Sequence, residues 1–244
     1  MNYTKFFLFF SLPIILLSGT AFSQIQFVDK FSIAGGPMVG WYIPKIKDLN
    51  TEFRKAGFPE ISESGYLTIG GGGFVDIKNI RIGGLGTGFT TTESVIQNNI
   101  NKTVKLSYGM GAIYTEYVGH ISKYFDFTAG GMIGFGRLTL YINQYSNDPY
   151  YWNINNATSD TSTIFRYNSS KLTSTVFSFQ PQAGIGAFLK EWLYLKLTAG
   201  YSFSLQTQWK LYDDKEVNNF PTGVKADGFN INLSLNLGLF LKDD

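Results

Sequence analysis

The chain has 244 residues, no cysteine, and 20 Lys+Arg against 18 Asp+Glu. This balanced charge argues against a nucleic-acid partner, which needs a basic surface, and without cysteine no disulfide holds the chain together. Glycine and aromatic residues are abundant, with 27 Gly, 22 Phe and 15 Tyr, while charged residues make up 16%. That mixture is typical of a membrane β-barrel, which has aromatic girdles outside and small residues inside.

Residues 1–23 have the features of a secretory signal peptide. Lys5 supplies the positive charge, residues 6–17 form the apolar segment, and a small-x-small site ends at Ser23. The alternative is an uncleaved membrane helix, but the apolar run is short and is interrupted by a serine and a proline. We predict cleavage after Ser23, which leaves a single domain over residues 24–244.

Eight stretches of the remaining sequence alternate between apolar and small or polar residues, which is the two-residue period of a β-strand. The most regular is 229–241, where the odd positions are large and apolar and Phe240 alone breaks the pattern. Its length of about 43 Å, at about 3.3 Å per residue, is enough to cross a membrane. The eight stretches are 31–41, 67–77, 80–91, 104–114, 125–142, 177–189, 193–205 and 229–241.

Two features of these stretches need an explanation. In the fifth, the apolar positions change phase between Phe135 and Leu138, which predicts a β-bulge near Gly136-Arg137. Many glycines also lie within the stretches, as in Gly70 to Gly73, although glycine normally weakens a strand. We expect these glycines to relieve crowding inside a narrow barrel.

The connections between the stretches alternate in length. Short turns at 78–79, 122–124 and 190–191 alternate with long segments at 43–65, 93–102, 146–171 and 210–228. Short periplasmic turns and long extracellular loops are typical of an outer-membrane barrel. Within the first long segment, helical spacing over 45–56 predicts a short helix, which Gly57 and Pro59 end.

The residues that favour catalysis are few. His120, the single histidine, lies two residues from Ser122, and the two side chains share a strand face as an acyl-transfer pair would. We expect His120 to lie instead at the periplasmic interface, beside a short turn, with the lipid-facing parity of Val118. Zinc requires several Cys or His ligands, which the sequence lacks.

Charged residues allow two further hypotheses. Asp213, Asp214, Glu216 and Asp227 are candidate calcium ligands, but they match no calcium-loop spacing, and a solvated acidic loop is the preferred interpretation. Four charged residues are candidates for the barrel interior: Asp76, Arg81, Lys105 and Lys196. We expect them to pair within a closed lumen rather than line a pore, because an isolated buried charge is costly. We therefore predict no catalytic, cofactor or metal site.

The pattern over residues 31–241 resembles the small eight-stranded outer-membrane barrels, the class of the OmpA transmembrane domain and OmpX. This resemblance concerns architecture and not a specific motif. The second hairpin, residues 70–84, is also similar to uncharacterised outer-membrane proteins of Bacteroidota-like bacteria. One departure is the C-terminus, where the class usually ends on an aromatic residue but Phe240 is followed by Leu-Lys-Asp-Asp.

The sequence thus predicts an all-β fold: an eight-stranded, antiparallel, up-and-down transmembrane β-barrel in a bacterial outer membrane. We expect a structural or surface-interaction role, no open pore and no enzymatic activity. The expected partners are outer-membrane lipids and an extracellular ligand or protein, bound through loops 43–65 and 146–171. Two alternatives stay open: a lipid-modifying outer-membrane enzyme, and a soluble secreted β-barrel that carries a small apolar ligand with its leucines inside.

Overall fold

The computed structural model describes residues 31–146 and 168–241, so the predicted signal peptide lies outside the described residues. One helix, α2 (Lys47–Lys55), follows the first strand. The strands are β1 (Phe31–Lys45), β2 (Tyr66–Ile77), β3 (Ile80–Gln97), β4 (Ile100–His120), β5 (Phe125–Ser146), β6 (Asn168–Lys190), β7 (Leu193–Gln206), β8 (Lys210–Leu211), β9 (Lys215–Glu216) and β10 (Lys225–Leu241). None of the helices in the described ranges is long and apolar enough to cross a membrane.

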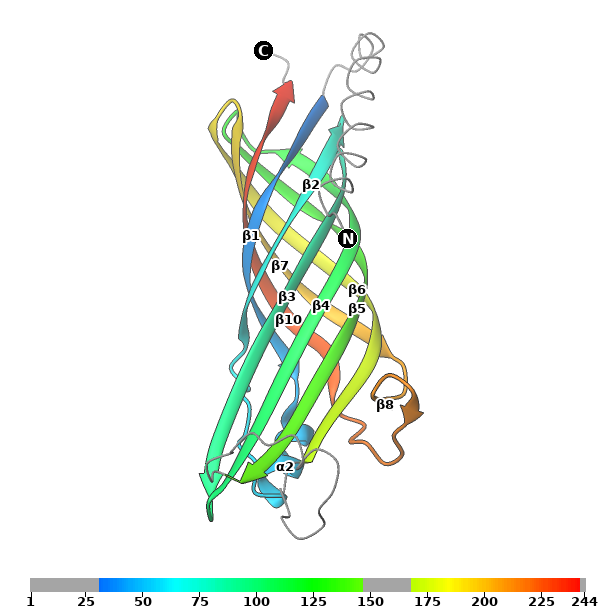
Figure 1. Cartoon of the computed structure of the whole chain (residues 1–244). Coiled ribbons are helices and arrows are strands. Elements are labelled where there is room, and N and C mark those ends of the chain that lie inside the picture. The colour runs from blue at the N-terminus through cyan, green and yellow to red at the C-terminus, as the bar shows by residue number, and fades with distance from the viewer. Residues whose placement is uncertain (1–30, 147–167, 242–244) are drawn as a thin grey trace, which may run out of the picture.

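Within the described residues, eight strands form a closed antiparallel ring in the order β1-β2-β3-β4-β5-β6-β7-β10, and β10 returns to pair with β1. Figure 1 shows the tilted strands of this barrel, with the short turns at one end and the long connections and α2 at the other. The predicted fold is therefore confirmed. The small strands β8 and β9 were not predicted; they form a hairpin that pairs with the outer part of β6.

The barrel exterior is apolar over the half that adjoins the short turns. Leu197 and Leu233 are 41% exposed, whereas Thr198 and Ser202, on the opposite face, are 8% and 3% exposed. The predicted outward and inward faces of β7 and β10 are therefore confirmed. Outward positions are mainly apolar or glycine over 31–43, 67–77, 80–88, 109–117, 125–135, 177–189, 193–205 and 229–241. These spans of nine to thirteen residues fit the roughly 9–11 residues that a tilted strand needs to cross a membrane.

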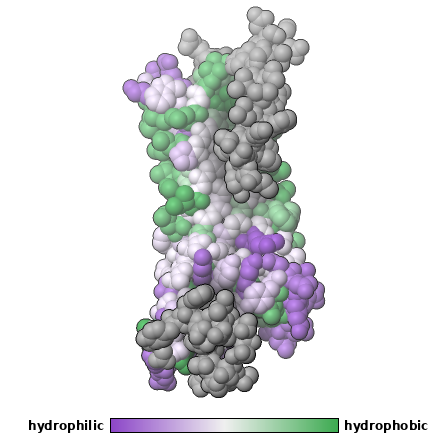
Figure 2. All heavy atoms as spheres, viewed as in Figure 1, coloured by the Kyte–Doolittle hydropathy of each residue, from purple (hydrophilic) through white to green (hydrophobic). Residues whose placement is uncertain are grey.

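Beyond this apolar belt, strands β3 to β6 continue outward, and their polarity reverses. Figure 2 shows hydrophilic residues gathered toward the end with the long connections. On β5, Phe135 is 66% exposed, but Leu138 and Leu140 point inward and are 3% and 0% exposed. The strand makes no bulge, because its pairing with β4 continues without a shift through Gly136 and Arg137. The predicted bulge is wrong: the phase changes because the strand leaves lipid for water, while the interior becomes an apolar core.

Strand β4 differs from the prediction along its whole length. Most of its apolar residues point inward, and Leu106 and Val118 are 0% and 1% exposed, whereas Ile113 and Tyr117 point outward. The lipid-facing assignment of the Val118 parity is therefore wrong. The inward ring of Tyr114 lies where a side chain on Gly83 would otherwise stand, so glycine on one strand makes room for bulk on the next. In contrast, Gly111 faces outward with open space around it, so lumen crowding does not explain this glycine.

The long connections are more ordered than expected. Segment 93–102 is not a loop, because β3 and β4 meet at a two-residue turn. Asn98 and Asn99 have φ values of 51° and 59° there, the left-handed conformation that a type I′ hairpin turn requires. The predicted helix is confirmed as α2, and Gly57, at φ 68°, follows its end. Of the predicted loop 146–171, residues 147–167 lie outside the described residues.

Candidate functional site

The outer end of the barrel is closed by an apolar core that lies beyond the lipid-facing belt. Helix α2 places Leu49 and Phe53 in this core, where they are 3% and 4% exposed, together with Ile61 of the same connection. Aromatic rings fill the level below, and Tyr66 stacks on Phe89 with centroids 4.5 Å apart and planes 8° apart. The connection between β1 and β2 therefore closes the outer end of the barrel.

A buried ionic cluster around Arg81 occupies the inner half of the lumen. Arg81 is 0% exposed, and its Nε and Nη2 donate to the two carboxylate oxygens of Asp76 at 2.7 and 2.8 Å. Its Nη1 donates to the Tyr194 hydroxyl at 3.0 Å, and that hydroxyl donates to Asp126 at 2.7 Å. The guanidinium also lies 3.9 Å from the centroid of the Phe74 ring. This two-point pairing with a carboxylate, with a further bond to a hydroxyl, offsets much of the cost of burying the guanidinium.

A second buried pair continues this network across the lumen. The Lys196 ammonium donates to Glu116 at 2.5 Å, and the amide of Gln182 donates to the other oxygen of Glu116 at 2.7 Å. Gln180 then links Gln182 to Asn230, with amide bonds of 3.0 and 3.2 Å. Because these side chains come from opposite walls, they tie β4, β6, β7 and β10 together through the interior.

The short-turn end is closed by aromatic side chains. Phe240 packs edge-on against Phe188, with centroids 5.2 Å apart, and lies 5.8 Å from Tyr194. This position explains why Phe240 breaks the alternation of the last strand: it points inward and helps to seal the periplasmic end. Phe74, also predicted to face inward, is 4% exposed in the same cluster.

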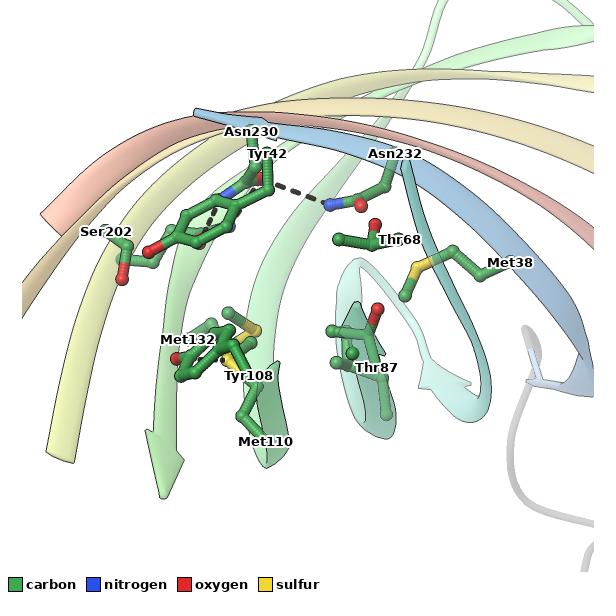
Figure 3. Close-up of a pocket in the computed structure, with 13 residues that line it drawn as sticks. Met38, Tyr42, Thr68, Thr87, Tyr108, Met110, Met132, Ser202, Asn230 and Asn232 are labelled. Carbon is green, nitrogen blue, oxygen red and sulfur yellow. Dashed lines mark hydrogen bonds between the residues drawn. The ribbon is translucent and has the colours of Figure 1, made fainter. Parts of the chain in front are cut away.

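Between these layers the interior leaves only small spaces. A cavity of about 30 Å³ lies where the polar network meets the apolar core, and another of about 40 Å³ lies nearer the short turns. Figure 3 shows the first of these, with Met38 on one side, Met110 and Met132 on the other, and the hydrogen-bonded Asn230 and Asn232 above. Spaces of this size hold about one or two water molecules each. Neither of these two cavities has room for a substrate or for a continuous water column.

The predicted interior charges are largely correct. Asp76, Arg81 and Lys196 lie inside, and Asp76 pairs with Arg81 as expected, but Lys196 pairs with Glu116 instead. The prediction that Lys105 faces inward is wrong. Lys105 is exposed on the outer face of β4 beyond the belt, because the inward parity of that strand belongs to its apolar residues. Sequence reasoning missed the buried Glu116 and Asp126, which are each 1% exposed. The outward phenylalanines on either side of Asp126 were the signal that could have revealed it.

The proposed acyl-transfer pair lies at the short-turn end, as expected. His120 is exposed at the last position of β4, and the turn that carries Ser122 follows it. The Ser122 hydroxyl oxygen accepts hydrogen bonds from the backbone N–H groups of Tyr124 and Phe125, both at 3.2 Å. Ser122 thus has a structural part in the turn.

Two of the four candidate calcium ligands, Asp213 and Asp227, contact cations and donors of the protein itself. Asp213 accepts from Lys171 at 2.6 Å, from Thr173 at 2.8 Å and from Arg137 at 3.1 Å. Asp227 accepts from the backbone and hydroxyl of Ser204, both at 2.7 Å. Across the described part of the chain, no group of three or more acidic, His or Cys residues is placed to hold a metal ion.

The Asp213 contacts predict a pH dependence for the β8–β9 hairpin. The hydrogen bond from Lys171, supported by Thr173, lowers the pKa of Asp213 below its ordinary value. The ionised Asp213 carboxylate therefore stabilises the hairpin, and this contribution is complete above the ordinary carboxyl pKa of about 4. It is lost as the pH falls through the lowered pKa and the carboxylate is protonated. Hydrogen exchange of the hairpin amides, corrected for the intrinsic effect of pH, should therefore rise at acidic pH. Asp213→Asn should show the faster exchange already at neutral pH, and the exposed neighbour control Asp214→Asn should not.

No known family model and no curated protein matches this sequence. Among solved structures, one that is similar is Ail, the attachment invasion locus protein of Yersinia pestis, in complex with the heparin analogue sucrose octasulfate. It has a TM-score of 0.35 and 14% identity, covering 86% of this chain and 97% of that chain. Another is the outer membrane protease OmpT from Escherichia coli, with a TM-score of 0.32 and 7% identity, covering 88% of this chain and 97% of that chain.

Similarities this low carry no argument about binding or activity. The assignment depends on the molecule itself: a closed antiparallel ring, an apolar belt of membrane height, and an interior that is polar where the exterior faces lipid. A soluble carrier would place its leucines inside, whereas Leu235 and Leu237 are 39% and 53% exposed on the exterior. The chain folds as an eight-stranded antiparallel β-barrel with an apolar outer belt of membrane height, the architecture that is typical of bacterial outer-membrane barrels.

Proposed function

We propose that this protein acts through its extracellular surface, as a closed barrel without a pore and without catalytic activity. The observation that supports this role is the filled interior: an apolar core, an ionic and amide network and an aromatic cluster follow one another along the lumen. Because these three layers fill the lumen, the side chains that a ligand or partner can reach lie on the outside of the barrel. The outer parts of β3 to β6 raise that surface well above the lipid.

The first extracellular connection, residues 43–65, is the proposed contact surface within the described residues. Helix α2 buries Leu49 and Phe53 and leaves the charged Glu52, Arg54 and Lys55 exposed, so one element both closes the mouth and faces the outside. Arg54 and Glu60 form a two-point ion pair with distances of 2.8 and 2.7 Å, which orders this surface. We also propose loop 146–171 as a contact segment, although most of it lies outside the described residues.

The absence of a pore leads to a direct test. In planar bilayers the inserted barrel should show no steady conductance above that of the bare membrane, because neither interior cavity exceeds about 40 Å³. A difference in gel migration between unheated and heated samples serves as the check that the inserted protein is folded. Large, reproducible openings that change in Lys196→Gln would establish a channel through the lumen and would refute the proposed role.

The alternative, a lipid-modifying enzyme centred on His120, has its own test. His120 and Ser122 lie at the short-turn end, separated from the outer leaflet by a hydrocarbon layer about 25 Å tall. We expect cells that express the wild type and cells that express His120→Ala to have the same lipid A and phospholipid profiles by mass spectrometry. A lipid product that appears with the wild type and is absent with His120→Ala would show that the protein is an enzyme.

A further inference from the structure

The barrel wall splits between β2 and β3 at the outer end of the belt. The two strands pair from Ile77–Ile80 up to Ile69–Gly88, and there their pairing ends. Strand β2 continues to Tyr66 paired with β1, while β3 continues to Gln97 paired with β4. Figure 1 shows β3 running on toward the long connections past the end of β2. The peptide edges of the two strands therefore face each other unpaired over the last part of β2.

Local structure explains the split. Gly65, at φ 108°, turns the chain into β2, so this strand begins lower than its neighbour. Behind the opening, the inward rings of Tyr66 and Phe89 stack face to face, 4.5 Å apart. The stacked rings thus lie on the inner side of the wall, at the level where the pairing of β2 with β3 has ended.

The split forms a shallow, open groove on the outer surface. One rim carries Leu67 and Ile69, which point outward and are 58% and 66% exposed. The other rim is formed by Gly88 and Thr90 of β3, and the floor includes the Phe89 ring. The groove therefore has one apolar rim, one rim of small residues and an aromatic floor.

The groove lies at the boundary between hydrocarbon and head groups. Trp41 is directly paired with Leu67 and is 44% exposed, and tryptophan is enriched at this depth of a membrane. On the other side, the outward residues of β3 change from glycine to threonine at Thr90, whose hydroxyl bonds to that of Ser107 at 2.6 Å. Lys105, exposed on the outer face of the next strand, β4, is paired with Thr92, and its ammonium lies 5.7 Å from the centroid of the Tyr141 ring on β5. Hydrocarbon thus lies below the groove, and a cation lies above it.

We propose that this groove binds an outer-leaflet lipid, with one acyl chain between Leu67 and Thr90 and the anionic head group at Lys105. The apolar rim and aromatic floor favour a hydrocarbon chain, because they offer it close van der Waals contacts. The basic side chain at head-group height supplies the charge complement for phosphate. The site is independent of the extracellular surface role, since it lies on the lipid side of the wall.

The test uses the refolded full barrel in phosphatidylcholine vesicles that contain phosphatidylglycerol with a photoreactive diazirine in one acyl chain. After illumination, mass spectrometry should locate adducts on Phe89 and Thr91, which have inward parity and are reached from lipid through the split. Leu138 and Leu140, inward residues behind a closed part of the wall, should carry none. Adducts restricted to outward residues would overturn the proposal.

Two matched variants test the groove and its head-group contact. Thr90→Trp fills the groove from its rim and should lose most of the Phe89 and Thr91 adducts, whereas Thr92→Trp, outward but above the groove, should keep them. Lys105→Gln should lower labelling by the phosphatidylglycerol probe and leave labelling by a diazirine phosphatidylcholine unchanged. Equal labelling of the two tryptophan variants would overturn the groove site, and no response to Lys105→Gln would overturn the head-group contact. The gel-migration check confirms folding of each variant.

Discussion

Arg81→Met is expected to lower the free energy of unfolding by about 3–5 kcal/mol, because it leaves buried carboxylates without their cation. Asp76 and Asp126 are 8% and 1% exposed, and Arg81 is the cation that contacts both of them. Methionine keeps much of the side-chain volume over the Phe74 ring, so the loss reports charge rather than a cavity. Urea unfolding of the barrel in lipid vesicles, followed by tryptophan fluorescence, measures the effect.

Two controls make this result specific. Arg137→Met removes an exposed ion pair with Asp213, whose two side chains are 58% and 42% exposed, and should cost at most about 1 kcal/mol. The triple variant Arg81→Met, Asp76→Asn, Asp126→Asn removes the unpaired charges and should recover most of the stability. Equal losses for Arg81→Met and Arg137→Met would mean that the interior cluster contributes no more than a surface pair.

Leu140→Ala should cost about 2–5 kcal/mol, which is the usual range for a fully buried leucine. Leu140 is 0% exposed in the apolar core above the belt, where it lies among Leu106, Val176 and the residues that close the mouth. The truncation should also loosen the first connection, since α2 packs on the same core. Unfolding free energies and the protease sensitivity of residues 46–64 measure the two effects.

The adjacent outward residue is the matched control for this prediction. Thr139 is half-buried on the polar face of β5, and Thr139→Ala should change stability by no more than about 0.5 kcal/mol. Because the two residues are neighbours on one strand, the pair tests which face is the core. A larger cost for Thr139→Ala than for Leu140→Ala would reverse the inside and outside of this part of the barrel.

Local sequence signals were sufficient for most of the elements and for the type of fold. Strict alternation in β7 and β10 identified long amphipathic strands, and the polar partners of their leucines identified the lumen face. Helical spacing followed by Gly57 located α2, and the rhythm of short and long connections identified the two ends of the barrel. Each of these signals is carried by residues that are close together in the chain, so it can be recognised from the sequence alone.

The sequence by itself therefore determined that the chain is a membrane barrel, where most of its strands lie, and that Asp76, Arg81 and Lys196 face inward. The tertiary structure decided which face of β4 and of the outer half of β5 is the interior, and it placed Glu116 and Asp126 in the ionic network. The physical reason is that a two-residue period shows that two faces differ but not what lies against each, because lipid and a closed protein core are both apolar. Ring closure, the height of the membrane on each strand and the split between β2 and β3 all depend on pairing between distant residues, so they appear only in the folded barrel.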